Sequence, residues 1–177
     1  TKHNKKIKFQ KFIMSKKNNL FLIMILLIIM ASVLCFAGCA EEKSESNSNK
    51  EYSVDAETLA SEIVSKVEFA SEMSKVESEV LDLFFTIEEG VTGVSYKAGG
   101  SLADEVTIFT APNKITAKKM LESVNSYIDE RKELFASYAP AEVAKLEKAV
   151  AIQKGKYVVF CVTDNIEAAK TIIDKAF

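Results

Sequence analysis

Apolar side chains recur at helical spacing in several segments of the chain. Asp55 is a candidate N-cap for a helix whose apolar stripe consists of Leu59, Ile63, Val67 and Ala70. This pattern predicts an amphipathic helix at the start of a folded region.

The same stripe continues as far as Phe84, but residues 74–77 (SKVE) have the pattern of a capping box. We therefore expect a break there and a second short helix that ends near Phe85. Pro112-Asn113 opens the longest predicted helix, and Pro140 suits the first position of a further short helix. Residues 165–177 predict a closing helix.

Alternating patterns indicate two hairpins. Residues 94–98 (VSYKA) and 105–108 (EVTI) alternate between apolar and polar, while residues 149–153 and 157–163 flank a tight Lys-Gly-Lys turn. The run YVVFCV within the last strand is apolar on both faces, as a covered central strand requires. The predicted fold class is α+β: an antiparallel sheet of about four strands from two hairpins, covered by a long central helix and by N- and C-terminal helices.

The N-terminal part has the layout of a secretory signal. Residues 20–36 are apolar except for Ser32, lysines precede them, and Ala37-Gly38-Cys39 follow. Bacterial lipoprotein signals end in Leu, a small residue, Gly or Ala, and then Cys; residues 36–39 (FAGC) resemble this box, with Phe in the first position. We expect residues 1–38 to be removed by cleavage between Gly38 and Cys39, and the Cys39 thiol to carry a diacylglycerol that anchors the protein to the membrane.

Two other interpretations of this segment stay open. The first is an uncleaved membrane helix, because residues 20–38 approach the ~20 apolar residues that such a helix needs. The second is ordinary secretion, in which the signal is cleaved after a small residue and no lipid is attached. The chain starts at Thr1, and Met14 is the expected initiator. Residues 1–13 would then be upstream sequence read in frame; the alternative is an overlong basic region.

Charge divides the chain into two different parts. Residues 1–38 hold seven lysines and no acid, which leaves 16 of the 23 basic side chains against all 25 acidic ones from Cys39 onward, a net charge of −9. Such a domain repels phosphate backbones, so we expect no nucleic-acid partner. Residues 39–51 lack large apolar side chains and predict a lipidated flexible tether, followed by a single domain over residues 52–177.

This arrangement resembles an uncharacterised family of short lipoproteins from clostridial and related bacteria, the domain of unknown function 4358 family. The matching stretches are the helix Asp55–Phe69, residues 103–109 (ADEVTIF), the helix around Arg131, residues 138–140 (YAP) and residues 155–158 (GKYV). The resemblance implies the fold and an extracytoplasmic location, and it supplies no chemistry.

Residue types needed for common catalytic systems are missing after Cys39. The single histidine is His3, so this part cannot form a Ser-His-Asp or Cys-His system or a zinc site that contains histidine. Cys161 lies in an apolar strand, where burial raises the pKa of a thiol, and it is best interpreted as a small core residue. There is no Walker loop and no haem, nicotinamide or flavin signature. We expect no cofactor and no metal.

Carboxylate doublets remain as candidates for acid–base chemistry or Ca²⁺ binding. They are Glu88-Glu89, Asp104-Glu105 and Asp129-Glu130, and none belongs to an ordered calcium loop. The favoured interpretation of the first two doublets is a solvated face or turn, and that of Asp129-Glu130 is surface pairing with Lys132 or Lys119. The aromatic residues are numerous for such a small domain and are expected mainly in the core; on an uncovered sheet face they would form a binding patch. They are Phe84, Phe85, Tyr96, Phe109, Phe135, Tyr138, Tyr157 and Phe160.

Arg131, the only arginine, lies on the apolar stripe of the long predicted helix with Val124, Ile128 and Phe135. A buried charge there is costly unless it meets an acid. Glu105 is the candidate partner, and the pair would tie the helix to the sheet or border a binding site. The alternative is an exposed arginine whose stem covers the apolar stripe.

The favoured function is therefore a non-enzymatic, lipid-anchored module on the outer face of the cell membrane that binds a protein, a peptide or a component of the envelope. The rival is a cell-envelope hydrolase that uses carboxylate or Ser-Lys chemistry. A buried carboxylate with a raised pKa in a cleft would favour the enzyme, whereas an exposed apolar patch would favour binding.

Overall fold

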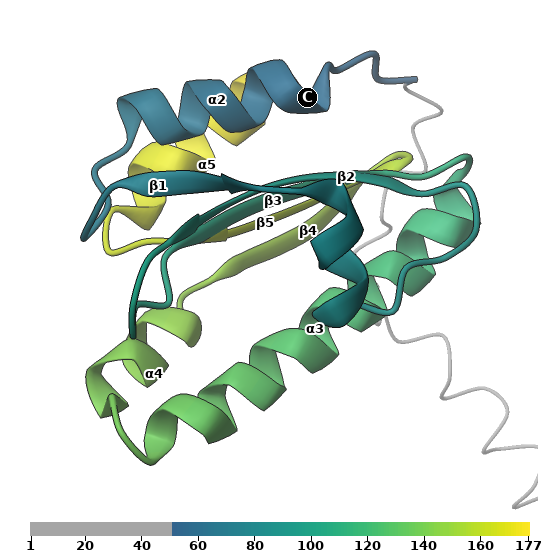
Figure 1. Cartoon of the computed structure of the whole chain (residues 1–177). Helices are drawn as coiled ribbons and strands as arrows, with labels where there is room; N and C mark the ends of the chain where they lie inside the picture. The colour runs from purple at the N-terminus through teal and green to yellow at the C-terminus, as the bar shows by residue number, and fades with distance from the viewer. Residues whose placement is uncertain (1–50) are drawn as a thin grey trace, which may run out of the picture. The chain divides into compact units, whose positions relative to one another are not determined.

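The computed structural model describes residues 51–177, so the predicted signal segment, the lipid attachment site at Cys39 and most of the tether lie outside the described residues. Within this range the chain forms five strands and five helical segments (Figure 1). In chain order they are α2 (Ala56–Lys66), β1 (Met73–Val76), the 3₁₀ helix η2 (Ser78–Leu83), β2 (Thr92–Ala98), β3 (Glu105–Thr110), α3 (Lys114–Ala136), α4 (Pro140–Leu146), β4 (Val150–Lys154), β5 (Tyr157–Val162) and α5 (Ile166–Ala176).

The strands form one antiparallel sheet in the order β1-β2-β3-β5-β4. Helices α2 and α5 cover one face of the sheet, and α3 and α4 cover the other (Figure 1). The predicted α+β class, the long central helix and the terminal helices are confirmed. Both predicted hairpins, β2–β3 and β4–β5, are present as well.

Side-chain oxygens cap the two helices whose starts the sequence indicated. Asp55 Oδ1 accepts a hydrogen bond of 2.7 Å from the amide of Thr58, and Asn113 Oδ1 accepts one of 2.9 Å from the amide of Thr116. Pro140 is the first residue of α4, as predicted.

Strand β5 contributes to the cores on both faces of the sheet. Val158, Phe160 and Val162 pack in the core under α3, whereas Val159 and Cys161 pack in the core under α2 and α5. All five side chains are fully buried. The prediction of a strand covered on both faces is confirmed.

The burial of Cys161 predicts a loss of stability in alkaline solution. Desolvation raises the pKa of the thiol from 9.0 to about 12. Above pH 9 the thiol loses its proton in the unfolded chain but keeps it in the folded chain, and this difference favours unfolding. The stability associated with the protonated thiol is therefore fully present below pH 9 and is lost as the pH rises toward 12. At two pH units above 9.0 we expect the wild type to lose about 3 kcal/mol relative to Cys161→Val. Urea unfolding of both proteins at pH 7, 9 and 11 measures this difference, and parallel pH curves would contradict it.

The segment from Met73 to Phe85 differs from the prediction. Residues 73–76 form an edge strand paired with β2, and a 3₁₀ helix follows, so the sheet has five strands instead of about four. Residues three apart in a strand lie on opposite faces, and Met73 and Val76 indeed pack against opposite cores. The same spacing resembles one stripe of a helix, which explains the error. The expected capping box is also wrong, because no side chain caps η2.

Candidate functional site

A buried polar cluster lies between α3 and the β2–β3 hairpin, with the carboxylate of Glu105 at its centre. Glu105 Oε2 accepts hydrogen bonds from Arg131 Nη1 at 2.7 Å and from the Tyr127 hydroxyl at 2.9 Å. Lys97 Nζ lies 3.3 Å from the same oxygen. The other oxygen, Oε1, accepts a hydrogen bond of 2.9 Å from the Thr107 hydroxyl. The structure thus brings together Glu105 and Arg131, the two residues that the sequence paired.

The secondary structure explains why these groups meet. Lys97 and Glu105 are directly opposed across the β2–β3 ladder, and they share the face that α3 covers. Tyr127 and Arg131 are four residues apart on α3, so they lie on the same side of the helix. Lys97 and Tyr127 were not among the residues predicted for the site. The alternation of β2 indicates Lys97, and the position four residues before Arg131 on the same helix indicates Tyr127.

The cluster holds two cations and one anion. Burial lowers the pKa of Lys97, partly offset by the charge of Glu105. Burial raises the pKa of Tyr127, and the negative charge of Glu105 raises it further, so the phenol remains a hydrogen-bond donor. With donors on both of its oxygens, Glu105 is suited to holding Lys97 and Arg131 in place rather than to exchanging protons with a substrate.

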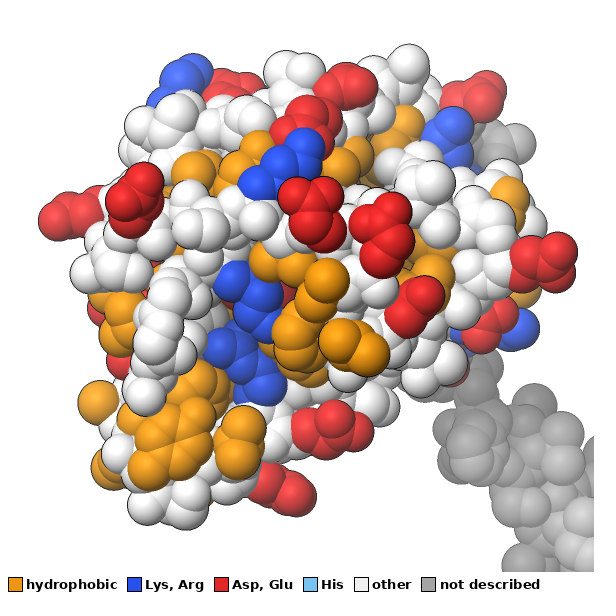
Figure 2. Space-filling model, viewed as in Figure 1, with side chains coloured by type: hydrophobic (Ala, Val, Ile, Leu, Met, Phe, Trp, Pro, Cys, Tyr) orange, Lys and Arg blue, Asp and Glu red, His pale blue; other side chains and the backbone are white. Residues whose placement is uncertain are grey.

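A shallow groove of about 150 Å³ lies directly over this cluster. Its walls come from the end of η2 and from the last turns of α3, and its lining residues are Leu83, Phe84, Tyr127, Glu130, Arg131 and Leu134. Figure 2 shows basic side chains next to apolar ones on the face that carries η2 and α3. The groove therefore combines apolar walls with one basic side chain, Arg131, and one acidic side chain, Glu130.

The apolar walls are unusually open to solvent. Leu83 is 78% exposed and Leu134 is 59% exposed. The ring of Phe84 lies over Lys97, with 4.0 Å between its centroid and the amine nitrogen. The exposed ring of Tyr138 packs against the buried ring of Phe135, with 5.3 Å between the ring centroids.

The predicted distribution of aromatic residues is only partly correct. The core interpretation is confirmed for the five buried rings, those of Phe85, Phe109, Phe135, Tyr157 and Phe160. In contrast, Phe84 is 38% exposed in the groove, and Tyr138, which follows α3 in the chain, is 52% exposed. The exposed aromatic surface lies along α3 and η2, not on an uncovered sheet face.

A second polar cluster ties α4 to the end of the sheet. Lys145 is buried, and its amine lies 2.6 Å from Asp104 Oδ2 and 3.2 Å from Glu142 Oε2. Burial acts to lower the pKa of Lys145, but the two carboxylates outweigh it and the pKa is raised. Asp104 Oδ1 also accepts from the amide of Ala70 at 3.3 Å, and Glu142 accepts from the amide of Ala103 at 2.7 Å. These contacts join three segments of the chain.

The two clusters correct the interpretation of one acidic doublet. Asp104 and Glu105 are both buried, so a solvated surface is wrong for this pair. The reason is that α3 and α4 each bring a basic side chain to one of them. Glu88 and Asp129 each pair with a lysine of α3 at the surface, as expected.

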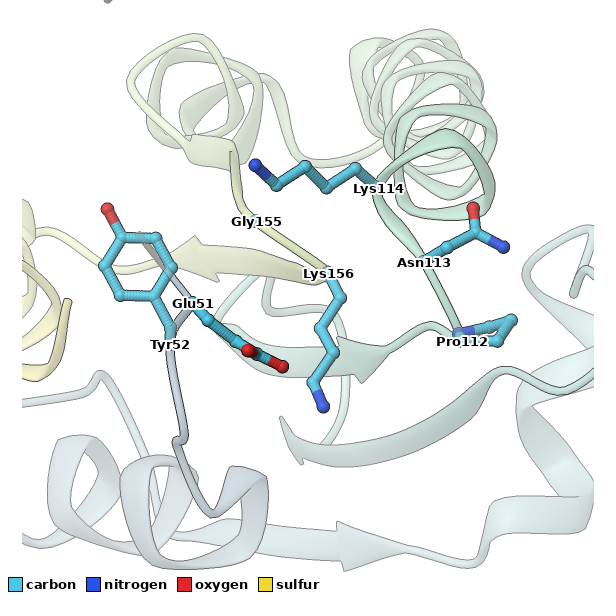
Figure 3. A pocket seen from close by; sticks show the side chains of 7 residues that line it. All are labelled: Glu51, Tyr52, Pro112, Asn113, Lys114, Gly155 and Lys156. Atoms are coloured by element: carbon cyan, nitrogen blue, oxygen red, sulfur yellow. The ribbon is translucent and has the colours of Figure 1, made fainter. Parts of the chain in front are cut away.

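A larger hollow, of about 380 Å³, lies at the start of α3. Its lining residues are Glu51, Tyr52, Pro112, Asn113, Lys114, Gly155 and Lys156. Figure 3 shows that the amines of Lys114 and Lys156 point in different directions, so the polar groups do not converge on one position. This hollow is a weaker candidate site than the groove.

Within residues 51–177, no group of three or more His, Cys, Asp or Glu side chains could hold a metal ion. None of the helices in the same range has the length and apolar character needed to cross a membrane.

The family model described as Domain of unknown function (DUF4358) matches residues 65–163. The chain belongs to this family. The matched range includes the whole sheet, α3, α4 and every residue of the groove, but it leaves out α5 and most of α2. It is therefore narrower than the resemblance, which included the helix from Asp55. No curated protein and no solved structure matches the chain.

Proposed function

We propose that this DUF4358 protein is a membrane-anchored extracytoplasmic binding module, and that the groove between η2 and α3 binds a protein, a peptide or an envelope component. One observation carries the proposal: among the described residues, three of the five large exposed apolar side chains line this groove. They are Leu83, Phe84 and Leu134. Exposed apolar side chains that gather in one place, bordered by polar ones, are typical of interaction sites.

The size of the groove favours a macromolecular or peptide ligand. Pockets for small molecules commonly enclose roughly 300–1,000 Å³, whereas this groove measures about 150 Å³. It has room for an inserted side chain rather than for a whole small molecule.

The buried carboxylates favour binding over carboxylate catalysis. Glu105 accepts hydrogen bonds on both oxygens, and Asp104 contacts Lys145 with one oxygen and a backbone amide with the other. Neither carboxylate lines the groove. Each of these two carboxylates forms an ion pair with a basic side chain of its cluster, which is the arrangement of a structural network.

The membrane anchor rests on the sequence of residues outside the described range. The apolar run, the preceding lysines and the Ala37-Gly38-Cys39 ending support cleavage before Cys39, a diacylglycerol on its thiol, and a location on the outer face of the cell membrane. The resemblance to short lipoproteins of clostridial and related bacteria supports the same proposal. Two acyl chains anchor a protein stably.

Capture of ligands from solubilised membranes tests this proposal. The full chain, purified with its anchor in detergent, is compared with Leu134→Glu in the groove and with Ile115→Glu as a matched control, an exposed apolar residue (76%) at the other end of α3. We expect species that the wild type and Ile115→Glu retain and that Leu134→Glu loses. Identical capture by all three proteins would contradict the role of the groove.

Mass spectrometry of the same preparation tests the anchor. We expect a mature N-terminus at Cys39 that carries a diacylglycerol. An unmodified peptide that runs through residues 37–41 would show that the signal is not processed as proposed.

A further inference from the structure

We infer that the ligand of this groove is a peptide segment that presents a carboxylate next to a large apolar side chain. The inference rests on the proposed function, because it names the chemical class that the same groove would bind. It is carried by three features: the charge of the cluster beneath the groove, the hydrogen-bond donors of Arg131 and the apolar walls.

The buried cluster beneath the groove has more positive than negative charge. Lys97 and Arg131 both contact the single carboxylate of Glu105, so the three groups together carry a net charge of +1. Glu130 also lines the groove, but its side chain is exposed, where solvent and salt screen its charge. A carboxylate that enters the groove would neutralise the remaining positive charge at low dielectric, where ionic contacts are strong.

Arg131 has donors left for such a group. Its guanidinium carries five N–H groups. Three of them donate within the described residues, to Glu105 and to the carbonyl oxygens of Ala103 and Leu102. The side chain also lines the groove. The planar fork of a guanidinium matches the two oxygens of a carboxylate, so the remaining N–H groups suit a ligand carboxylate.

The apolar walls favour a ligand that carries an apolar side chain next to its carboxylate. Leu83, Phe84 and Leu134 line the groove together with Arg131, and burying them against an apolar side chain removes their surface from water. A polyanion or an anionic bilayer is disfavoured, because the chain from Cys39 onward carries a net charge of −9. A single carboxylate on an otherwise neutral, apolar peptide meets the least long-range repulsion.

Nuclear magnetic resonance offers a sharp test, because Arg131 is the only arginine and gives a single Nε–H signal. The mature ¹⁵N-labelled chain, in neutral detergent micelles, is titrated with three acetylated peptides: Leu-Phe with a free carboxylate, Leu-Phe amide, and Leu-Glu-Phe amide. We expect a saturable shift of the Arg131 signal with the first or third peptide, and binding about tenfold weaker for the neutral amide, since a charge-assisted hydrogen bond is lost. The first and third peptides distinguish a chain terminus from an acidic side chain as the source of the carboxylate.

Controls separate this inference from the proposed function. The shift should persist in Ile115→Glu and disappear in Leu134→Glu. Equal binding of the neutral amide would overturn the carboxylate while leaving a binding groove in place. If acetate alone shifted the Arg131 signal as much as the peptides do, the requirement for an apolar side chain would be overturned. If phosphatidylglycerol displaced the peptide, the site would be assigned to a lipid headgroup instead. If no peptide shifts the signal, the inference fails, and the capture experiment with Leu134→Glu then decides separately whether the groove binds anything.

Discussion

Replacing Glu105 with glutamine should lower the free energy of unfolding by about 3–5 kcal/mol, the usual effect of removing one partner from a buried ion pair. Glutamine keeps the shape of the side chain but removes the negative charge. Lys97 and Arg131, which both contact this carboxylate, would then be buried cations beside each other without an anion. Urea denaturation of the wild type and of Glu105→Gln measures the difference.

A double-mutant cycle assigns this loss to the pair. Arg131→Met should cost less than Glu105→Gln, about 3 kcal/mol, because Lys97 still neutralises Glu105. The double variant should lose less than the sum of the single losses. The exposed pair Glu62–Lys66 is the control, with an expected coupling of about 0.3–0.5 kcal/mol. Additive losses at Glu105 and Arg131, within about 0.5 kcal/mol, would show that the two residues are not coupled.

The second large loss of folding stability is expected on replacement of Lys145. Lys145→Met keeps the length of the side chain but leaves the buried Asp104 without its cation, so we expect a loss of about 3–5 kcal/mol. Lys132→Met is the matched control, because Lys132 pairs with the exposed Asp129 on the surface of α3 and should cost well under 1 kcal/mol. Similar losses for the two variants in urea denaturation would mean that the Lys145–Asp104 contact is worth no more than a surface pair.

Local patterns predicted most of the fold. The helix caps at Asp55 and Asn113 and the two hairpins depend on residues that are close together in the sequence, and each is present in the structure. The edge strand β1 could not be predicted in this way. Its four residues become a strand because they pair with β2, about 20 residues further along the chain, and their spacing in isolation resembles a helix.

The candidate site was predictable only in part. Arg131 was conspicuous as a charge on an apolar stripe, and the face of Glu105 followed from strand alternation. The contribution of Lys97 depends on the register of the β2–β3 hairpin, which the six-residue connection 99–104 leaves undetermined in the sequence. The groove itself could not be foreseen, because it depends on where η2 lies against α3.

Site-specific photocrosslinking in intact cells tests most directly whether the groove is a binding surface. A photoreactive phenylalanine analogue replaces Leu134 in the groove or, as the control, Ile115 at the other end of the same helix; both positions are exposed, so neither replacement should disturb the fold. We predict a discrete crosslinked product at position 134 that is absent at position 115. The same products at both positions, or none at position 134, would contradict the assignment of the groove as the binding site.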